Sequence, residues 1–242
     1  MRGQQSLTWT TSLTNEIGRL PKGIGKNRPA HKKTEGKNTL NLIKQRQVPW
    51  NAKITYANFV CNIKTQKAES HRTRLTVGSD KLDYPADTSA PAVGLLDTKV
   101  HLNSFISDSK KGARYFVADI KKYYLNNLLI HLQYMRIHAK YFIEEFRKEY
   151  NTDEFIDKYG YVYCEIRKGM YGLKEARCVA FQNLVNNLAP FGYEPMPCTP
   201  GLFLHNTRRT TFTLDVDDSG IKHFNQDDLD HPLNALKTHY TI

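Results

Sequence analysis

The sequence predicts an α+β protein in which an antiparallel sheet is backed by helices on one face. Residues 175–189 carry apolar side chains at steps of four, the period of a helix with one buried face. Residues 212–216 alternate apolar and polar side chains, and a short stretch at 221–224 follows a turn, which is typical of a β-hairpin. Strands and helices that alternate in this way favour a sheet with helices packed on one side.

The first half of the chain is polar and basic up to residue 47, and a β pattern follows. Residues 13–20 form a predicted helix with Thr14 as its cap, ended by a proline and a glycine. Residues 54–77 alternate loosely and predict strands. The other elements expected in this half are a turn at 78–80, a proline-containing loop at 83–92, and a helix or buried segment at 99–107.

The second half begins with an apolar run at residues 114–118, which predicts a short buried strand. The hairpin of residues 212–224 is expected to turn at residues 217–220, where Asp-Asp-Ser-Gly stands. The remaining expected elements are a helix at 142–150, a strand at 161–166 and a helix from Pro232 to Tyr240.

The charge of the chain is strongly positive, at +11 for 35 Lys and Arg against 24 Asp and Glu. Residues 1–53 hold eleven of the basic residues and two acids, so 11 − 2 = +9 lies in this stretch. Such a segment suits a nucleic-acid backbone, where Lys and Arg replace condensed counterions. The alternative is a solvated arm without a partner.

The four cysteines are far apart and form no CxxC pair, which predicts free thiols in a reducing compartment. The N-terminus has no apolar run like a signal peptide, and no segment approaches the ~20 apolar residues of a membrane span. We therefore expect an intracellular protein that is not secreted and has no membrane partner.

Two acidic positions are candidates for metal chemistry. Asp119 directly follows the apolar run, and Asp217 and Asp218 stand together in the hairpin. Mg²⁺ prefers oxygen ligands and is usually shared between a few carboxylates and substrate phosphates, and two such ions can promote phosphoryl transfer. The alternative for Asp217-Asp218 is an ordinary turn, in which aspartate side chains bond nearby amides.

The surroundings of these acids resemble the motifs of copia-type retrotransposon reverse transcriptases. Residues 119–126 read Asp-Ile-Lys-Lys-Tyr-Tyr-Leu-Asn, where the family has Asp, Val or Ile, Lys, two variable residues, an aromatic, Leu and Asn. Residues 214–218 stand where the family has Leu-Tyr-Val-Asp-Asp. The other matching segments are Tyr-Met at 134–135, Met-Tyr-Gly-Leu-Lys-Glu-Ala at 170–176, Gly-Tyr at 192–193 and Thr-Pro-Gly-Leu-Phe at 199–203. Their order is more specific than any one of them.

The resemblance implies a right-hand polymerase that binds an RNA or DNA template-primer and a deoxynucleoside triphosphate. Residues 1–47 would be a basic, partly disordered N-terminal segment of the fingers, 48–112 the fingers, and 113–242 the palm. Asp119, Asp217 and Asp218 match the three acids that hold Mg²⁺ or Mn²⁺, and phosphoryl transfer depends mainly on positioning and charge neutralisation by these ions.

The resemblance also implies residues that contact the nucleotide. Tyr124 matches the aromatic under its sugar, and a core aromatic is the alternative for this side chain. Tyr171 and Gly172 match a turn that packs against the nucleotide, next to Lys174, which could equally be a surface lysine. Arg72 and Arg74 match basic positions of the fingers that hold the triphosphate, and an alternating strand would place both on one face.

Three residues depart from the family pattern. Asp215 replaces the Tyr of the Tyr-x-Asp-Asp box and would add a carboxylate to the catalytic face. Ser219 replaces a bulky apolar residue, and Arg177 replaces a proline.

The resemblance further implies that a thumb and a ribonuclease H domain would lie beyond the end of the chain, as in a piece of a retrotransposon polyprotein. Such a protein would work in a cytoplasmic particle or in the nucleus. Two alternatives remain open. One is a catalytically inactive remnant that at most binds nucleic acid, and the other is an RNA-binding module, although the motif of that class is missing. The oligomeric state cannot be predicted.

Overall fold

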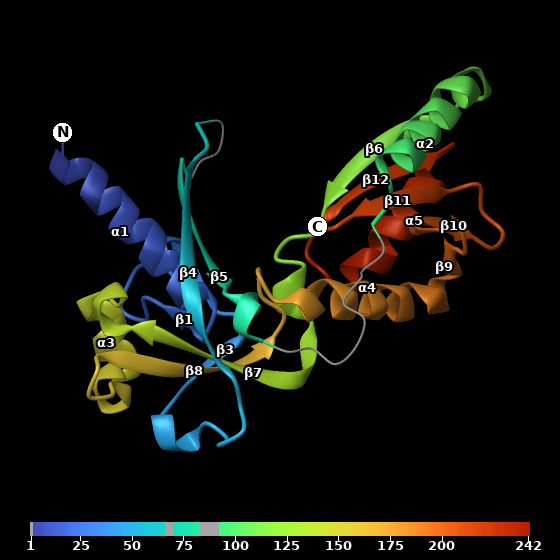
Figure 1. Ribbon diagram of the computed structural model, residues 1–242. Helices are drawn as coiled ribbons and strands as arrows, with labels where there is room; N and C mark the ends of the chain where they lie inside the picture. Colours follow the sequence, from blue (N-terminus) through green and yellow to red (C-terminus); the bar gives the residue numbers. More distant parts are fainter. Residues whose placement is uncertain (1, 66–69, 83–91) are drawn as a thin grey trace. The chain divides into compact units, whose positions relative to one another are not determined.

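The structure is a computed structural model that describes residues 2–65, 70–82 and 92–242, with side chains from Leu7 onward (Figure 1). Within these residues it has five α-helices and three β-sheets, a mixed architecture that agrees with the predicted α+β class. Of the loop expected at 83–92, residues 83–91 lie outside the described residues.

Packing divides the chain into two units. The first combines Met1–Asp87 with Leu128–Ala176, and the second combines Thr88–Asn127 with Arg177–Ile242. These units are defined by packing alone, so the assignment of residues to fingers and palm stays a prediction.

The first unit is built on a five-stranded sheet in the order β3-β8-β7-β4-β5. β4 and β7 run parallel, and the other neighbouring strands run antiparallel. The strands are β3 (Leu40–Ile43), β4 (Ile54–Ile63), β5 (His71–Val77), β7 (Leu128–His138) and β8 (Tyr161–Lys168). The unit also contains helix α1 (Arg2–Arg19), helix α3 (Glu144–Tyr150) and a small sheet of β1 (Gly23–Ile24) and β2 (Thr34–Glu35). The strands predicted at 54–77 and 161–166 are therefore confirmed.

The first helix begins much earlier than predicted. α1 has 18 residues, and Thr14 lies inside it, buried, with its Oγ1 donating to the carbonyl of Thr10 at 2.7 Å. The assignment of Thr14 as a cap was therefore wrong. Residues 2–12 have few apolar side chains, so the helical period that marks residues 13–20 does not extend over them.

Polar side chains of α1 cover the free edge of β5. Ser12 Oγ accepts a hydrogen bond from the amide of Thr73 at 2.8 Å, and Glu16 Oε1 accepts one from the amide of Leu75 at 3.1 Å. All four residues are buried. Because β5 is the last strand of the sheet, these amides would otherwise be left without a partner. The polar residues of α1 thus replace a sixth strand.

The second unit is built on a fully antiparallel five-stranded sheet in the order β6-β12-β11-β10-β9. Its strands are β6 (Arg114–Asp119), β9 (Tyr193–Met196), β10 (Thr199–His205), β11 (Thr211–Asp215) and β12 (Asp218–His223). Its helices are α2 (Leu95–Asp108), α5 (Gln226–Lys237) and the greater part of α4 (Lys174–Leu188).

One face of this sheet packs on α4 and α5. The predicted helical stripe of Ala180, Leu184 and Leu188 is fully buried in this core. Phe203 and Phe212, from neighbouring strands, stack with their ring centroids 4.7 Å apart in the same core. Side chains alternate along a strand, so the neighbours of these core residues point to the opposite face.

Helix α2 packs on that opposite face, so the expectation of helices on only one face was wrong. His101 Nε2 lies 2.9 Å from Thr211 Oγ1, and the Lys222 ammonium donates to Asp108 at 2.8 Å. Thr211 and Lys222 alternate with core residues along β11 and β12 and therefore face away from α4 and α5. The pattern of α2 does not signal this packing, since Leu95 and several other apolar side chains of α2 are exposed.

The strand expected at 114–118 exists but is not buried as predicted. β6 lies at the edge of the sheet, and Phe116 and Val117 are 39% and 65% exposed. Only Ala118 of its apolar side chains belongs to the core. An apolar run cannot distinguish an edge strand from a central one.

The last helix also begins earlier than predicted, at Gln226 and not at Pro232. The Asn225 side chain caps it by accepting from the amide of Asp228 at 2.8 Å. Pro232 lies inside the helix and cannot donate to the carbonyl of Asp228, four residues before it. That carbonyl accepts instead from Thr210 Oγ1 at 2.8 Å, which removes one cost of a proline at this place.

No helix among the described residues is long and apolar enough to cross a membrane. The four cysteines, all of them described, are free, as predicted, and burial raises the pKa of the Cys164 thiol to about 12.

The buried imidazole of His101 predicts a loss of stability in mild acid. Burial and the neighbouring Lys222 charge lower its pKa from 6.5 to about 4. The unfolded chain therefore binds this proton first, and the free energy of unfolding should fall by up to about 3 kcal/mol as the pH drops from 6.5 to 4. We expect His101→Gln to remove this part of the pH dependence, measured by urea unfolding at several pH values. Equal pH slopes for both proteins would contradict the assignment.

Candidate active site

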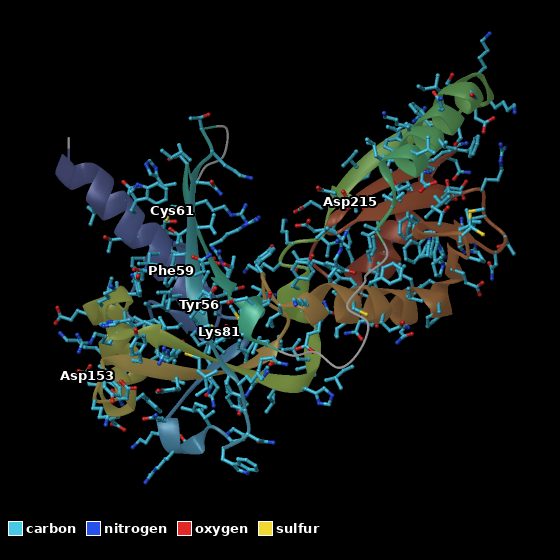
Figure 2. The ribbon with its side chains drawn as sticks, in the orientation of Figure 1. Tyr56, Phe59, Cys61, Lys81, Asp153 and Asp215 are labelled. Carbon is cyan, nitrogen blue, oxygen red and sulfur yellow. The ribbon has the colours of Figure 1, made fainter. Side chains whose placement is uncertain are left out.

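Three carboxylates stand side by side across the end of the second unit's sheet. In the strand register, Asp218 lies opposite Asp119 of β6 on one side and opposite Asp215 of β11 on the other. Side chains of directly opposed residues share a face and have Cβ atoms about 4.5–5.5 Å apart. All three belong to the face that α2 packs against, at the strand ends away from the α2 contacts, and all three are exposed. Figure 2 labels Asp215 at this end of the sheet.

The hairpin tip is fixed to the end of β6 by the backbone. The predicted hairpin is confirmed, but its turn consists of Val216 and Asp217 between the paired Asp215 and Asp218, two residues earlier than the turn expected at 217–220, and Val216 takes a positive φ of 60°. The carbonyl of Asp217 accepts from the amide of Ile120 at 2.8 Å. Ser219 is buried in β12, and its hydroxyl donates to the carbonyl of Ala118 at 3.1 Å.

Ser219, which stands where the family pattern has a bulky apolar residue, therefore joins β12 to β6. Together with the amide of Ile120, it holds the main chain of Asp217 and Asp218 beside that of Asp119. The main chain brings together the three acids that the motif predicts.

These acids offer only hard oxygen donors, the type that Mg²⁺ and Mn²⁺ prefer. The donor set therefore suits such ions. Within the described residues, no group of three or more His, Cys, Asp or Glu side chains is arranged to hold a metal ion. Asp119 and Asp218 are exposed, so packing does not fix their rotamers as it would in a core.

Tyr124 lies after the loop that leaves β6, in a 3₁₀ turn of Tyr124–Asn126. It is half-buried and packs against the core of the second unit, with its ring 5.7 Å from that of Tyr123. Tyr123 is the fully buried neighbour, and burial, followed by the charges of Tyr240, Tyr124 and Asp217, raises its pKa. Tyr124 thus combines a core contact with an accessible edge.

A small hollow of about 360 Å³ adjoins Asp119. It runs along the outer side of β6 towards α5, and Lys121 and Lys237 contribute positive charge to it. Lys121 also donates from its ammonium to the carbonyl of Ile242 at 3.2 Å.

The predicted triphosphate residues lie in the first unit, where β5 places Arg72 and Arg74 on one face. The strand alternates as expected, with Thr73, Leu75 and Val77 buried and both arginines partly exposed. The Arg74 guanidinium lies 4.7 Å from the centroid of the Tyr171 ring, a cation–π contact. Figure 2 labels Tyr56, Phe59 and Cys61 on the neighbouring strand β4.

The main chain at Tyr171 and Gly172 continues the hydrogen bonding of β5. The Tyr171 carbonyl accepts from the amide of Val77 at 2.8 Å. Gly172 has a φ of +95°. A Cβ at this position would overlap the carbonyl oxygen of Val77 and would lie 2.8 Å from the backbone nitrogen of Val77. Both the conformation and the space require glycine. The structure therefore brings together Arg74, Tyr171 and Gly172, three of the residues that the motif singles out.

Lys174 is the first residue of α4 and is exposed. Glu175, which is not among the predicted site residues, is buried, with one carboxylate oxygen accepting from Gln133 Nε2 at 3.1 Å. Burial raises its pKa, while the Gln133 bond and His131 act the other way. A carboxylate in the first turn of a helix is normally a surface feature, so no signal in the sequence could have revealed its burial.

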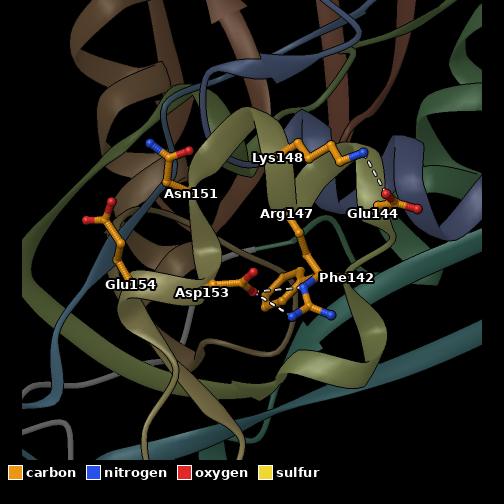
Figure 3. A pocket seen from close by; sticks show the side chains of 7 residues that line it. All are labelled: Phe142, Glu144, Arg147, Lys148, Asn151, Asp153 and Glu154. Atoms are coloured by element: carbon orange, nitrogen blue, oxygen red, sulfur yellow. Dashed lines mark hydrogen bonds and ion pairs between the residues drawn. The ribbon is translucent and has the colours of Figure 1, made fainter.

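A larger, open hollow of about 770 Å³ lies beside α3 (Figure 3). Figure 3 shows four of its five charged residues in two ion pairs: Lys148 bonds Glu144 at 2.6 Å, and Arg147 bonds Asp153 at 2.6 Å. Its lining residues are Phe142, Glu144, Arg147, Lys148, Asn151, Asp153 and Glu154. Because these four charged groups already have partners, this hollow is a weaker candidate than the acidic sheet end.

Comparison of the chain with protein-family models and with curated proteins finds no match.

The contact between Gly172 and Val77 predicts a large effect for a single methyl group. We expect Gly172→Ala to lower the free energy of unfolding by about 2–4 kcal/mol, because it adds an overlap with Val77 to the strain of a positive φ. Gly112→Ala is the matched control, since Gly112 also has a positive φ but has nothing within 4 Å of a Cβ. Denaturant unfolding of both variants should show the larger loss of unfolding free energy for Gly172→Ala. Equal losses would show that the overlap with Val77 contributes nothing beyond the strain of the positive φ.

Proposed function

We propose that this chain is an RNA-directed DNA polymerase, a reverse transcriptase of a copia-type retroelement, that performs two-metal nucleotidyl transfer. The observation that carries the proposal is the register of Asp119 with Asp218, together with the bond from Ile120 to Asp217. These acids are far apart in the chain, and the motif predicts that they act together.

In the proposed reaction, Asp119, Asp217 and Asp218 would hold two Mg²⁺ or Mn²⁺ ions. When bound, the ions activate the primer 3′-hydroxyl and neutralise charge on the phosphates. The hydroxyl would release its proton to water, and its oxygen would bond to the α-phosphorus of the deoxynucleoside triphosphate. The bond from that phosphorus to the oxygen bridging to the β-phosphate would break, and pyrophosphate would leave. The accessible edge of Tyr124 supports the nucleotide's sugar.

Arg72 and Arg74 are the residues that we propose bind the triphosphate. Arg72 and Arg74 present guanidinium groups on one face of β5, and these groups suit phosphate oxygens. Tyr171 would orient the Arg74 guanidinium through their cation–π contact. Gly172, which has no Cβ, lets the main chain of its turn approach Val77 of β5 closely. Lys174 would add an ammonium group to the two guanidinium groups. The +9 charge of residues 1–53 would attract the RNA or DNA template-primer. We place this activity in a retroelement particle of the cytoplasm or in the nucleus.

One observation favours a second candidate, a remnant that binds nucleic acid without catalysis. Asp215 stands directly opposite Asp218, so a fourth carboxylate faces the metal acids. Its charge would repel the phosphates of a primer. Binding through the basic residues would remain, and its affinity would fall steeply as salt is raised.

Primer extension on a primed RNA template separates the two candidates. We expect extension with Mg²⁺ or Mn²⁺, and a loss of at least ~100-fold in Asp217→Asn and Asp119→Asn, because each removes an ionic metal ligand. Asp153→Asn is the control, since Asp153 is an exposed acid of the first unit paired with Arg147. Folding of each variant is checked by circular dichroism.

Absence of extension by all folded proteins would eliminate the active polymerase. If salt-dependent binding to nucleic acid then remained, the second candidate would stand. Extension that survives in Asp217→Asn would place the chemistry elsewhere.

The role of Arg74 predicts a change in nucleotide affinity and not in folding. We expect Arg74→Ala to raise the KM for the deoxynucleoside triphosphate about tenfold, because a partly desolvated cation leaves the phosphate site. Arg74→Lys should recover only part of this loss, since an ammonium cannot stack on Tyr171 as a guanidinium does. Thr76→Ala, two residues along the same face, should leave KM unchanged. Steady-state kinetics on one template would decide.

A further inference from the structure

Two residues that depart from the family motifs meet in the second unit. Arg177, in the first turns of α4, has its Nη2 atom 3.9 Å from Oδ1 of Asp215 at the end of β11. The two side chains are 41% and 67% exposed. The distance exceeds that of a hydrogen bond, so the contact is one of charge and not of fixed geometry.

The charge of Asp215 needs a counterpart at this place. Asp215 lies opposite Asp218, which lies opposite Asp119, so three like charges occupy adjacent positions of one sheet face. Like charges directly opposite one another on neighbouring strands destabilise the pairing. Arg177 lies beside Asp215, the last of these three acids, and offsets its charge.

We propose that Arg177 is a positioning residue that offsets the charge of Asp215, so that Asp215 does not become a fourth metal ligand. The proposal rests on the proposed function of Asp119, Asp217 and Asp218. It makes Asp215 compatible with a polymerase site, since the net charge facing a primer is then that of three carboxylates. Arg177 acts through Asp215 and contacts neither the metal ions nor the substrate.

The test is a cycle of four proteins: the unchanged chain, Arg177→Ala, Asp215→Asn and the double variant. We expect Arg177→Ala to tighten Mn²⁺ binding about two- to fivefold, because a fourth carboxylate becomes available. Electron paramagnetic resonance measures the bound Mn²⁺. Affinity for a primed template at low salt should fall by a similar factor, because the charge of Asp215 is no longer offset. The double variant should match Asp215→Asn in both measurements.

Arg209→Ala is the matched control, because Arg209 is also an arginine of the second unit but packs on the ring of Phe224, 3.7 Å away, at the other end of β11. Arg209→Ala should not change Mn²⁺ binding, and the effect of Asp215→Asn on Mn²⁺ binding should be the same with and without it. The proposal would be overturned if Arg177→Ala weakened nucleic-acid binding by the same factor in the unchanged chain and in the Asp215→Asn variant. Arg177 would then be a direct phosphate contact.

A chain that binds no Mn²⁺ would count against the proposed metal site and not by itself against the pair. The pair would then be judged on thermal unfolding and on template affinity. The pair would be supported if Arg177→Ala lowered the midpoint of thermal unfolding by about 1–2 °C in the unchanged chain but not in the Asp215→Asn variant. Equal losses in both backgrounds, or no change at all, would overturn it.

Discussion

The pairing of β12 with β6 is the constraint on which the acidic sheet end depends. Its register is set by the core, because Ile221 and Ala118 must both face α4 and α5. Once these side chains point into the core, alternation turns Asp218 and Asp119 to the other face. A slip of one residue would bury a carboxylate and expose an apolar side chain, which costs far more than any surface contact could return. The hydrophobic core therefore positions the acids without touching them.

The elements of this sheet were predicted well from the sequence because their signals are local. Alternation marked β11 and its hairpin, and the stripe through Leu184 marked α4. The position of the turn was missed because Asp-Asp-Ser-Gly has strong turn propensity, while the strand pairing is better served when Ser219 and Gly220 stay in β12. Gly220 lies there beneath the hydroxyl of Tyr115, where a side chain would overlap. Tertiary packing overrode local preference.

The predicted starts of α1 and α5 were too late for the same physical reason. Both helices begin in polar segments that are stabilised by contacts with residues distant in the chain, such as Ser12 with Thr73 and Asp228 with Thr210. A hydrophobic period cannot report such bonds, since the side chains that make them are polar. The same limit applies to the site. The motif singled out the acids and Gly172 as candidates, but the pairing of Arg177 with Asp215 and the burial of Glu175 depend on the fold alone.

The residues of the proposed site fall into two groups of opposite charge. The acidic sheet end, taken alone, repels the phosphates on which it is proposed to act, and Arg177 offsets only one of its charges. The guanidinium groups of Arg72 and Arg74 and the basic N-terminal residues carry the opposite sign. It follows that affinity for nucleic acid would arise from the basic residues, whereas divalent ions would be needed before the acids could tolerate a triphosphate beside them. Binding and chemistry would then respond differently to salt and to metal, because they depend on separate groups of residues in this chain.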